Sequence, residues 1–267
     1  MPRSATLEIM IRAATRAARS LARDFGEVEQ LQVSIKGPGD FVSAADRRAE
    51  QTIKEELKRG RPDYGLLMEE SGAEPGRSPH NRWIVDPLDG TTNFLHGLPH
   101  WAISIALEQH GEITAGIVFD PLRNELFTAE RGAGAYLNDR RIRVSRRTEM
   151  RTALIGCGLP IQNWAAREKG FTRQMDRVAD ECAGLRRLGV AALDLAYVAA
   201  GRQDGYWEHG VKPWDIAAGL LMVREAGGRV GLLEGNEDLL ADGTFIAGNP
   251  DIYDKLRAAL LEATPQG

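Results

Sequence analysis

Cysteine is scarce in this chain, and its scarcity limits what can hold the fold together. Only Cys157 and Cys182 occur among 267 residues, and they form no CxxC pair. The five histidines show no HxH spacing. We therefore expect neither a disulfide framework nor a structural zinc site, and we expect a reducing, cytoplasmic compartment.

Long apolar runs and a strong net charge are also missing. No segment approaches the roughly 20 apolar residues that a membrane-spanning helix needs, and residues 1–26 contain no uninterrupted apolar stretch typical of a signal peptide. The formal net charge of -4 is too small to indicate nucleic acid or an anionic membrane as the main partner. With 43% hydrophobic residues the chain can bury a sizeable core. We expect a protein without membrane association.

The hydrophobic pattern changes near residue 150, which predicts two halves of one compact unit. Residues 1–150 begin with predicted helices at 5–24 and 44–59 and continue as short strands suited to an antiparallel sheet, an α+β half. Residues 151–267 alternate strands with helices, as is typical of an α/β half. Residues 71–81 are rich in Gly, Pro and Ser and are predicted to form a loop.

The stretch Trp83–Phe94, WIVDPLDGTTNF, places two aspartates three residues apart at the end of an apolar strand. Strand side chains alternate between faces, so Asp86 and Asp89 do not converge if the strand continues regularly through both. We interpret Pro87 as the end of the strand, followed by a turn that brings Asp89 beside Asp86. An Asp/Gly turn with a threonine cap is the alternative, and this stretch alone leaves both interpretations open.

The chemistry of the same stretch suits a metal ion and a phosphate. Two neighbouring carboxylates repel each other unless a cation lies between them. With the backbone carbonyl of Leu88 they offer hard oxygen ligands, which Mg²⁺ prefers. Gly90 lets the backbone approach a ligand closely, and the N–H groups of a helix that starts at Thr91 and Thr92 are suited to bind phosphate.

Two further stretches, MEES at 68–71 and PWDIAAG at 213–219, carry isolated carboxylates. Glu69 and Glu70 end a predicted strand, and their opposite directions prevent both from being direct ligands of one ion. Asp215 stands at a predicted helix start, where the helix dipole favours an aspartate in any case. A capping charge is therefore the alternative to a ligand role for Asp215.

Taken in this order, MEES, WIVDPLDGTTNF and PWDIAAG resemble the three defining motifs of the inositol monophosphatase family. GDFVSAAD before them and GVAALDLAYVAAGRQDGYWEHG between them match the family too, so the resemblance extends from about Lys36 to Gly228. It implies a layered α/β fold, the α-β-α-β-α sandwich of the inositol monophosphatase and fructose-1,6-bisphosphatase type, with the active site where the two halves meet. It also implies a homodimer, two or three Mg²⁺ ions per site, and inhibition by Li⁺ at the second magnesium position.

The resemblance further implies roles for individual residues. The implied metal ligands are Glu69, Asp86, the Leu88 carbonyl, Asp89 and Asp215; the implied catalytic residues are Glu69, Thr91 and Asp46; and the implied substrate contacts are Asp89, Gly90, Thr91, Thr92, Gly189, Val190, Ala191, Glu208 and Asp215. Thr91, linked to Asp46, and Glu69 would orient the attacking water. Glu208 would accept hydrogen bonds from substrate hydroxyls.

Two departures from the family pattern lie on the alcohol side of the predicted pocket. The family usually has Ser or Thr where Val190 stands, and residues 156–164 do not clearly show the serine that some members direct at the substrate. Arg186 and Arg187 are interpreted as solvated or salt-bridged, with contact to a phosphate or a partner subunit as the alternative. The departures concern the choice of alcohol and leave the hydrolysis of a phosphomonoester as the predicted reaction.

The predicted substrate is a small phosphorylated polyol or sugar, and myo-inositol 1-phosphate is the first choice. Histidinol phosphate, fructose 1,6-bisphosphate and a 3′-phosphoadenosine nucleotide are the alternatives. DGTTNF rather than DGTKEF argues against the nucleotide, whereas Val190 favours histidinol phosphate. A function of another class is also open, because some bacterial relatives bind transcription-antitermination factors.

Overall fold

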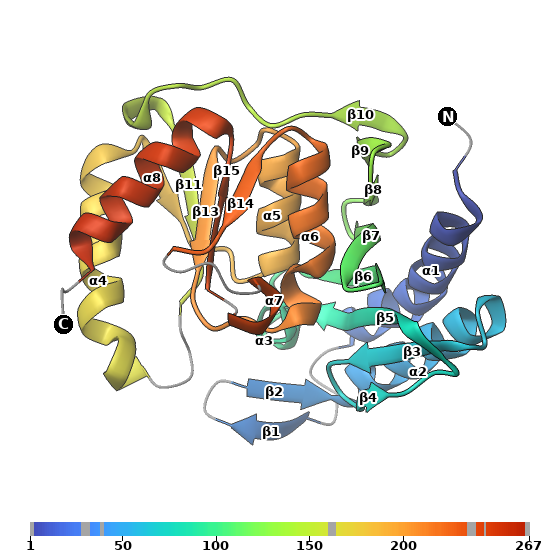
Figure 1. Ribbon diagram of the computed structural model, residues 1–267. Coiled ribbons are helices and arrows are strands. Elements are labelled where there is room, and N and C mark those ends of the chain that lie inside the picture. Colours follow the sequence, from blue (N-terminus) through green and yellow to red (C-terminus); the bar gives the residue numbers. More distant parts are fainter. Residues whose placement is uncertain are drawn as a thin grey trace.

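The computed structural model describes residues 3–27, 33–37, 40–159, 164–233, 239–242 and 244–264. Two β-sheets lie between three layers of helices, so that the order through the molecule is α-β-α-β-α (Figure 1). This is the layered α/β fold class predicted from the sequence. Among the residues described, no helix combines the length and the hydropathy that crossing a bilayer requires.

The first outer layer consists of α1 (Ala5–Phe25) and α2 (Ala44–Gly60), which pack together against the larger sheet. Helix α1 begins after Ser4, whose hydroxyl accepts a hydrogen bond from the Leu7 N–H at 3.1 Å. Its apolar stripe, which includes the completely buried Met10 and Leu21, faces the sheet while its arginines face outward.

The larger sheet has eight strands in the order β10-β9-β8-β7-β6-β5-β3-β4. All neighbouring pairs are antiparallel except β3 and β5, which are parallel. The strands are β3 (Tyr64–Met68), β4 (Gly72–Glu74), β5 (Ser78–Asp89), β6 (Ala102–Gln109), β7 (Glu112–Asp120), β8 (Glu125–Glu130), β9 (Gly134–Leu137) and β10 (Arg140–Ile142). A separate antiparallel ribbon joins β1 (Val33–Gly37) to β2 (Asp40–Ser43).

Residues 71–81 are not the loop that their composition predicts. They contain β4 and the start of β5, and Glu74 pairs with Leu66 while Ser78 pairs with Tyr64. The prediction was wrong because the edge of an existing strand supplies hydrogen-bond partners that are remote from this segment in sequence. Local turn propensity cannot register such tertiary pairing.

The smaller sheet has five strands in the order β12-β11-β13-β15-β14, with both parallel and antiparallel neighbours. They are β11 (Leu154–Cys157), β12 (Gly184–Arg186), β13 (Gly205–Glu208), β14 (Arg229–Gly231) and β15 (Phe245–Gly248). A short 3-10 turn, η2 (Met150–Thr152), precedes it. Helices α4 (Trp164–Glu181) and α8 (Pro250–Ala263) cover its outer face. The change of sheet falls between residues 142 and 154, and the division of the chain at residue 150 into two halves remains a prediction.

The central layer consists of α5 (Ala191–Ala199) and α6 (Pro213–Glu225), which lie between the two sheets (Figure 1). Both helices are apolar around most of their circumference because both of their faces are covered. The backbone of α6 comes so close to β7 that a Cβ at Gly116 would lie 2.9 Å from the Ala218 Cα. Short α7 (Leu239–Asp242) contacts α6.

A buried carboxylate fastens α2 to α1. Glu56 is 1% exposed and accepts hydrogen bonds from Arg12 at 2.9 Å, from Arg59 at 2.6 Å and from Arg16. These bonds, led by that from Arg16, hold the pKa of Glu56 below its ordinary value of 4.5, although burial opposes the shift.

We expect Glu56→Gln to lower the free energy of unfolding at pH 7 by about 1–3 kcal/mol, because charged hydrogen bonds to three arginines are weakened. Because the pKa of Glu56 is lower in the folded than in the unfolded protein, its ionised form stabilises the fold above pH 4.5. This contribution is lost as the pH falls through the folded-state pKa. Chemical denaturation at several pH values should therefore show the difference from wild type shrinking below pH 4.5. The exposed neighbour Glu55→Gln is the control, and an equal loss in both variants would contradict the assignment.

Candidate active site

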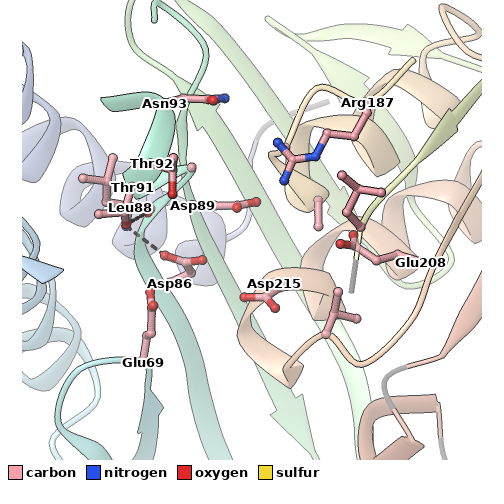
Figure 2. Close-up of a pocket in the computed structure, with 15 residues that line it drawn as sticks. Glu69, Asp86, Leu88, Asp89, Thr91, Thr92, Asn93, Arg187, Glu208 and Asp215 are labelled. Carbon is pink, nitrogen blue, oxygen red and sulfur yellow. Dashed lines mark hydrogen bonds between the residues drawn. The ribbon is translucent and has the colours of Figure 1, made fainter. Parts of the chain in front are cut away.

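Strand β5 runs through Pro87 to Asp89, so the prediction that Pro87 ends the strand was wrong. Its pairing with β6 sets Asp86 opposite Ser104 and Asp89 opposite Ala102, which leaves one extra residue on β5. This is a β-bulge. The bulge cancels the odd spacing of the two aspartates, and both side chains consequently lie on one face of the sheet (Figure 2).

The turn after the bulge holds its own geometry by local hydrogen bonds. Asp86, 2% exposed, accepts a hydrogen bond from the Leu88 N–H at 2.8 Å. Gly90 has φ of 94° and starts the short helix α3 (Thr91–Leu95). A Cβ at Gly90 would lie 2.8 Å from Val190 Cγ2, so only glycine fits both the backbone angle and the space.

Glu69 and Thr91 reach the same region from two different elements. Glu69 follows β3, and its N–H donates to the Val85 carbonyl of β5 at 3.2 Å. The Thr91 hydroxyl lies 3.0 Å from Asp46 Oδ1 and 3.1 Å from the Leu88 carbonyl oxygen, and its single proton serves one acceptor at a time. Asp46 is completely buried at the start of α2.

The two central helices reach the site with their first turns. Asp215 lies in the first turn of α6, where one carboxylate oxygen accepts a hydrogen bond from the Lys212 N–H at 2.7 Å. The Ala192 N–H in the first turn of α5 donates to Asp89 Oδ2 at 2.7 Å. Ser104 fixes the start of α6 to the sheet by donating to the Trp214 carbonyl at 3.2 Å. The positive ends of both helix dipoles therefore face carboxylates.

These elements surround a cavity of about 190 Å³. Figure 2 shows the carboxylates of Glu69, Asp86 and Asp89 on one side of it, Glu208 on the other, and Asp215 between them. Its lining comprises Glu69, Asp86, Leu88, Asp89, Gly90, Thr91, Thr92, Asn93, Leu159, Arg187, Gly189, Ala191, Glu208, Val211 and Asp215.

Val190 is the predicted site residue whose side chain does not face the cavity. It is 1% exposed and belongs to the apolar cluster of the central layer, next to Gly90. Its neighbours Gly189 and Ala191 do line the cavity. Asp46 also lies outside the lining and is connected to the site through Thr91. The Val190 side chain therefore cannot contact a ligand in this cavity.

Four carboxylates in one partly closed space create an unfavourable negative potential. Burial raises the pKa of Asp86 well above its ordinary value, and the charges of Glu69, Asp89 and Asp215 raise it further. The pKa of Asp89 is also raised well above its ordinary value, by burial and by Asp215, although the Ala192 N–H opposes the shift. A bound divalent cation would remove this penalty.

The chemistry of these donors fits a hard divalent cation such as Mg²⁺, because carboxylates and a backbone carbonyl are its preferred protein ligands. Within the described ranges, however, no three Asp, Glu, His or Cys side chains converge closely enough to hold one ion. All four carboxylates nevertheless line one cavity.

Glu208, at the end of β13, forms the opposite wall. Its carboxylate accepts a hydrogen bond from the Tyr206 hydroxyl and is packed against Gly158. Burial raises the pKa of Glu208 to about 7, with the Tyr206 hydrogen bond and the charge of Arg187 opposing the shift.

Arg187, which we expected to be solvated or salt-bridged, lines the cavity. Among the fifteen lining residues it is the one cation, and its guanidinium is turned into the cavity (Figure 2). It follows β12, which pairs in parallel with β11, and ligands commonly bind at the carboxyl ends of parallel strands. The position after a predicted strand was the sequence feature that could have indicated a ligand contact. The Arg-Arg doublet did not reveal which of the two arginines turns inward.

Known proteins resemble the chain over nearly its whole length. The sequence profile described as the Inositol monophosphatase family matches residues 3–266. A protein named inositol-1-monophosphatase from Mesorhizobium japonicum is 56% identical over 263 residues, which are 98% of this chain and 97% of the relative. A protein named Nus factor SuhB from Pasteurella multocida is 44% identical over 250 residues, 94% of this chain and 93% of the relative.

A solved structure agrees with the fold as well. The crystal structure of the extragenic suppressor protein SuhB from Bartonella henselae superposes with a TM-score of 0.93 at 53% identity, covering 96% of this chain and 98% of that one. The resemblance drawn from the three motifs is confirmed by these similarities, and so is the layered fold.

Proposed function

Because the chain belongs to the inositol monophosphatase family and is accordingly a phosphoric monoester hydrolase, we propose that it hydrolyses myo-inositol 1-phosphate to inositol and phosphate. The observation that carries this proposal is the cavity itself. Four carboxylates and the Leu88 carbonyl line a cavity of about 190 Å³, which also contains the start of α3 and is bounded on its other side by Glu208. Such a space suits a small phosphorylated alcohol bound by its phosphate at one end and its hydroxyls at the other.

Mg²⁺ is the proposed cofactor, with two or three ions per site. Glu69, Asp86 and the Leu88 carbonyl would hold the first, and Asp86, Asp89 and Asp215 the second. When bound, such ions supply Lewis-acid activation of water and neutralise charge on the phosphoryl and leaving oxygens.

The residues beside the metal ligands position the two reactants. When Thr91 donates its proton to Asp46, its lone pairs are free to accept a hydrogen bond from the attacking water. Glu69 would accept the second hydrogen bond of that water, which fixes its direction of attack. The N–H groups of Gly90 and Thr91 at the start of α3, with the Thr92 side chain beside them, would receive the phosphate.

At the alcohol end, Glu208 would accept hydrogen bonds from substrate hydroxyls. Gly189 and Ala191 would contact the substrate mainly through their backbone, and any contribution of Val190 would come from its backbone because its side chain is buried. Since family members usually carry a hydroxyl residue at that position, this end decides among the alternatives named above. These are histidinol phosphate, fructose 1,6-bisphosphate and a 3′-phosphoadenosine nucleotide.

A comparison of kcat/KM for the four substrates with Mg²⁺ present tests the proposal. We expect the highest value for myo-inositol 1-phosphate. A higher value for histidinol phosphate would reassign the substrate and keep the reaction. Failure to release phosphate from any sugar or polyol phosphate would contradict the function altogether.

Arg187 provides a sharper test of how the cavity holds an anion. We expect Arg187→Ala to raise KM about tenfold with little change in kcat, because a charged hydrogen-bond donor to the bound substrate is lost while the carboxylates stay in place. Initial rates over a range of substrate concentrations separate the two constants. Arg186→Ala is the matched control, since this exposed neighbour donates to the Leu185 carbonyl and does not line the cavity. Equal effects of both substitutions would sink the assignment.

Further properties of the family are proposed with this function. We propose a cytoplasmic homodimer that Li⁺ inhibits by occupying the second magnesium position. Light scattering after gel filtration measures the assembly, and rates at increasing Li⁺ concentration measure the inhibition. An active monomer would contradict the homodimer. Unchanged rates at millimolar Li⁺ would contradict the inhibition.

The names of two relatives favour a second candidate function. The proteins from Pasteurella multocida and Bartonella henselae carry the name SuhB, the former as a Nus factor. We therefore propose association with transcription-antitermination factors as an additional role. An Asp89→Asn variant without phosphatase activity should still rescue a deletion strain if this role matters, whereas loss of rescue together with activity would contradict it.

A further inference from the structure

A buried acid and a buried amide lie behind the wall of the cavity. Asp194 in α5 is 1% exposed, and Gln203, which precedes β13, is 2% exposed. Gln203 Nε2 donates to Asp194 Oδ1 at 2.7 Å. The other two polar atoms of the pair, Asp194 Oδ2 and Gln203 Oε1, have no hydrogen-bond partner among the described residues.

One proton would satisfy both of these atoms. An ionised carboxylate and an amide oxygen are acceptors only, so an ionised Asp194 leaves two buried acceptors without a donor, which is costly. A proton on Asp194 Oδ2 provides the missing donor for Gln203 Oε1. The two side chains then form a closed ring of two hydrogen bonds.

We propose that Asp194 is a neutral carboxylic acid that donates its Oδ2 proton to Gln203 Oε1, and that this ring is a positioning device which joins α5 to β13. Helix α5 supplies the Ala192 N–H that holds Asp89 at 2.7 Å. Strand β13 ends in Glu208, on the far wall of the cavity. The ring thus connects the two elements that carry the opposite sides of the site.

The surroundings of the pair favour the neutral acid. The titratable or charged groups that act on this region are Arg187 after β12, Cys157 in β11, and Tyr206 and Glu208 in β13. Burial raises the pKa of Asp194 to about 7, while the hydrogen bond from Gln203 and the charge of Arg187 oppose the shift. Gln203 Oε1 is packed against Gly156, where any larger residue would overlap it.

A neutral Asp194 also limits the negative charge around the cavity. The cavity already contains Glu208 in addition to the four carboxylates near α3. An ionised Asp194 would place one more negative charge behind Glu208, whose own pKa its charge raises. As a neutral acid, Asp194 supports the wall without adding to this repulsion.

Asp194→Asn is the decisive variant, because an asparagine amide can replace the proposed O–H donor and keep the ring. Infrared difference spectra of wild type minus the variant at pH 6 should show one neutral-acid carbonyl stretch that the variant lacks, because the band of Glu208 is common to both proteins and cancels. Asp204→Asn is the control: Asp204 is also completely buried, but it accepts hydrogen bonds from the Leu154 N–H, from Ser145 and from Arg147. That substitution should leave the neutral-acid band in place.

The pH dependence of stability gives a second readout. A folded-state pKa raised from 3.8 to about 7 stabilises the fold fully below 3.8, and this contribution is lost as the pH rises to about 7. The Tm of wild type relative to Asp194→Asn should therefore fall between these pH values and remain constant above them. Absence of the neutral-acid band together with a pH-independent difference in Tm would overturn the proposal and indicate an ionised, hydrated Asp194.

The positioning role has its own measurement, which rests on the proposed function. Asp194→Leu removes the ring and should raise KM several-fold and also lower kcat, because both Glu208 and the Ala192 N–H that holds Asp89 shift. Asp194→Asn should restore KM. If both variants keep the wild-type KM, the positioning role is wrong, whereas the infrared result stands independently of any activity.

Discussion

Replacing Asp86 by asparagine is expected to lower kcat about 10³-fold or more and, at the same time, to make the metal-free protein more stable. The two effects have one cause. Asp86 is 2% exposed beside three other carboxylates, so its charge is unfavourable unless a cation lies beside it. Asparagine keeps the acceptor for the Leu88 N–H and removes the charge.

The measurements are kcat with saturating Mg²⁺ and the Tm with and without Mg²⁺. We expect the Mg²⁺-dependent rise in Tm of the wild type to shrink strongly in Asp86→Asn, since ligand binding to the folded state alone raises stability. Asp120→Asn is the matched control. Asp120 is equally buried, but it accepts hydrogen bonds from two backbone N–H groups and from Arg123, so losing its charge should destabilise the protein.

The opposite result has a clear meaning as well. If Asp86→Asn lowers the Tm of the metal-free protein and leaves the Mg²⁺-dependent rise unchanged, then Asp86 is a turn residue. Accepting the hydrogen bond from the Leu88 N–H would then be the only role of Asp86. The turn interpretation that the sequence left open would then be correct.

Gly90→Ala is expected to lower kcat/KM about 10²-fold, as for a displacement of the order of 1 Å at a reacting centre. Gly90 has φ of 94°, and an added Cβ would lie 2.8 Å from Val190 Cγ2 and 3.2 Å from the His100 carbonyl oxygen. The start of α3 must therefore move, and with it the N–H groups proposed to receive the phosphate.

Gly97→Ala separates this displacement from the cost of the backbone angle. Gly97 follows α3 with φ of 68°, and an added Cβ there meets nothing within 4 Å. Both substitutions strain a left-handed backbone, but only that at Gly90 creates an overlap. The double variant Gly90→Ala with Val190→Ala should recover part of the loss by opening space. Equal losses of kcat/KM in Gly90→Ala and Gly97→Ala would contradict this explanation.

The sequence predicted those parts of the fold that local pattern determines. The amphipathic α1 and the helix that starts after Gly90 were predicted because periodicity and glycine conformation are properties of the segment itself. Residues 71–81 were mispredicted because their strands exist only through pairing with β3. The bulge at Pro87 was missed for the same reason, since a register is a property of two strands.

The candidate site, like the fold, was predicted only where the sequence itself carries the information. Motif order led to Glu69, Asp86, Asp89 and Asp215, and the structure places all four around one cavity. Their roles as ligands remain predictions. The orientation of Val190 and Arg187 depends on packing between elements distant in sequence, so the residue names gave no direction for either side chain.

The central layer has a consequence for how the chain can be divided. Helices α5 and α6 belong to the second half of the sequence, yet their apolar surfaces are covered by both sheets. A fragment cut near residue 150 would keep one sheet and expose the surface that this layer covers, which is the condition under which hydrophobic fragments aggregate. The two halves are therefore expected to unfold in a single cooperative transition, and neither is expected to serve as an independent module in a fusion protein.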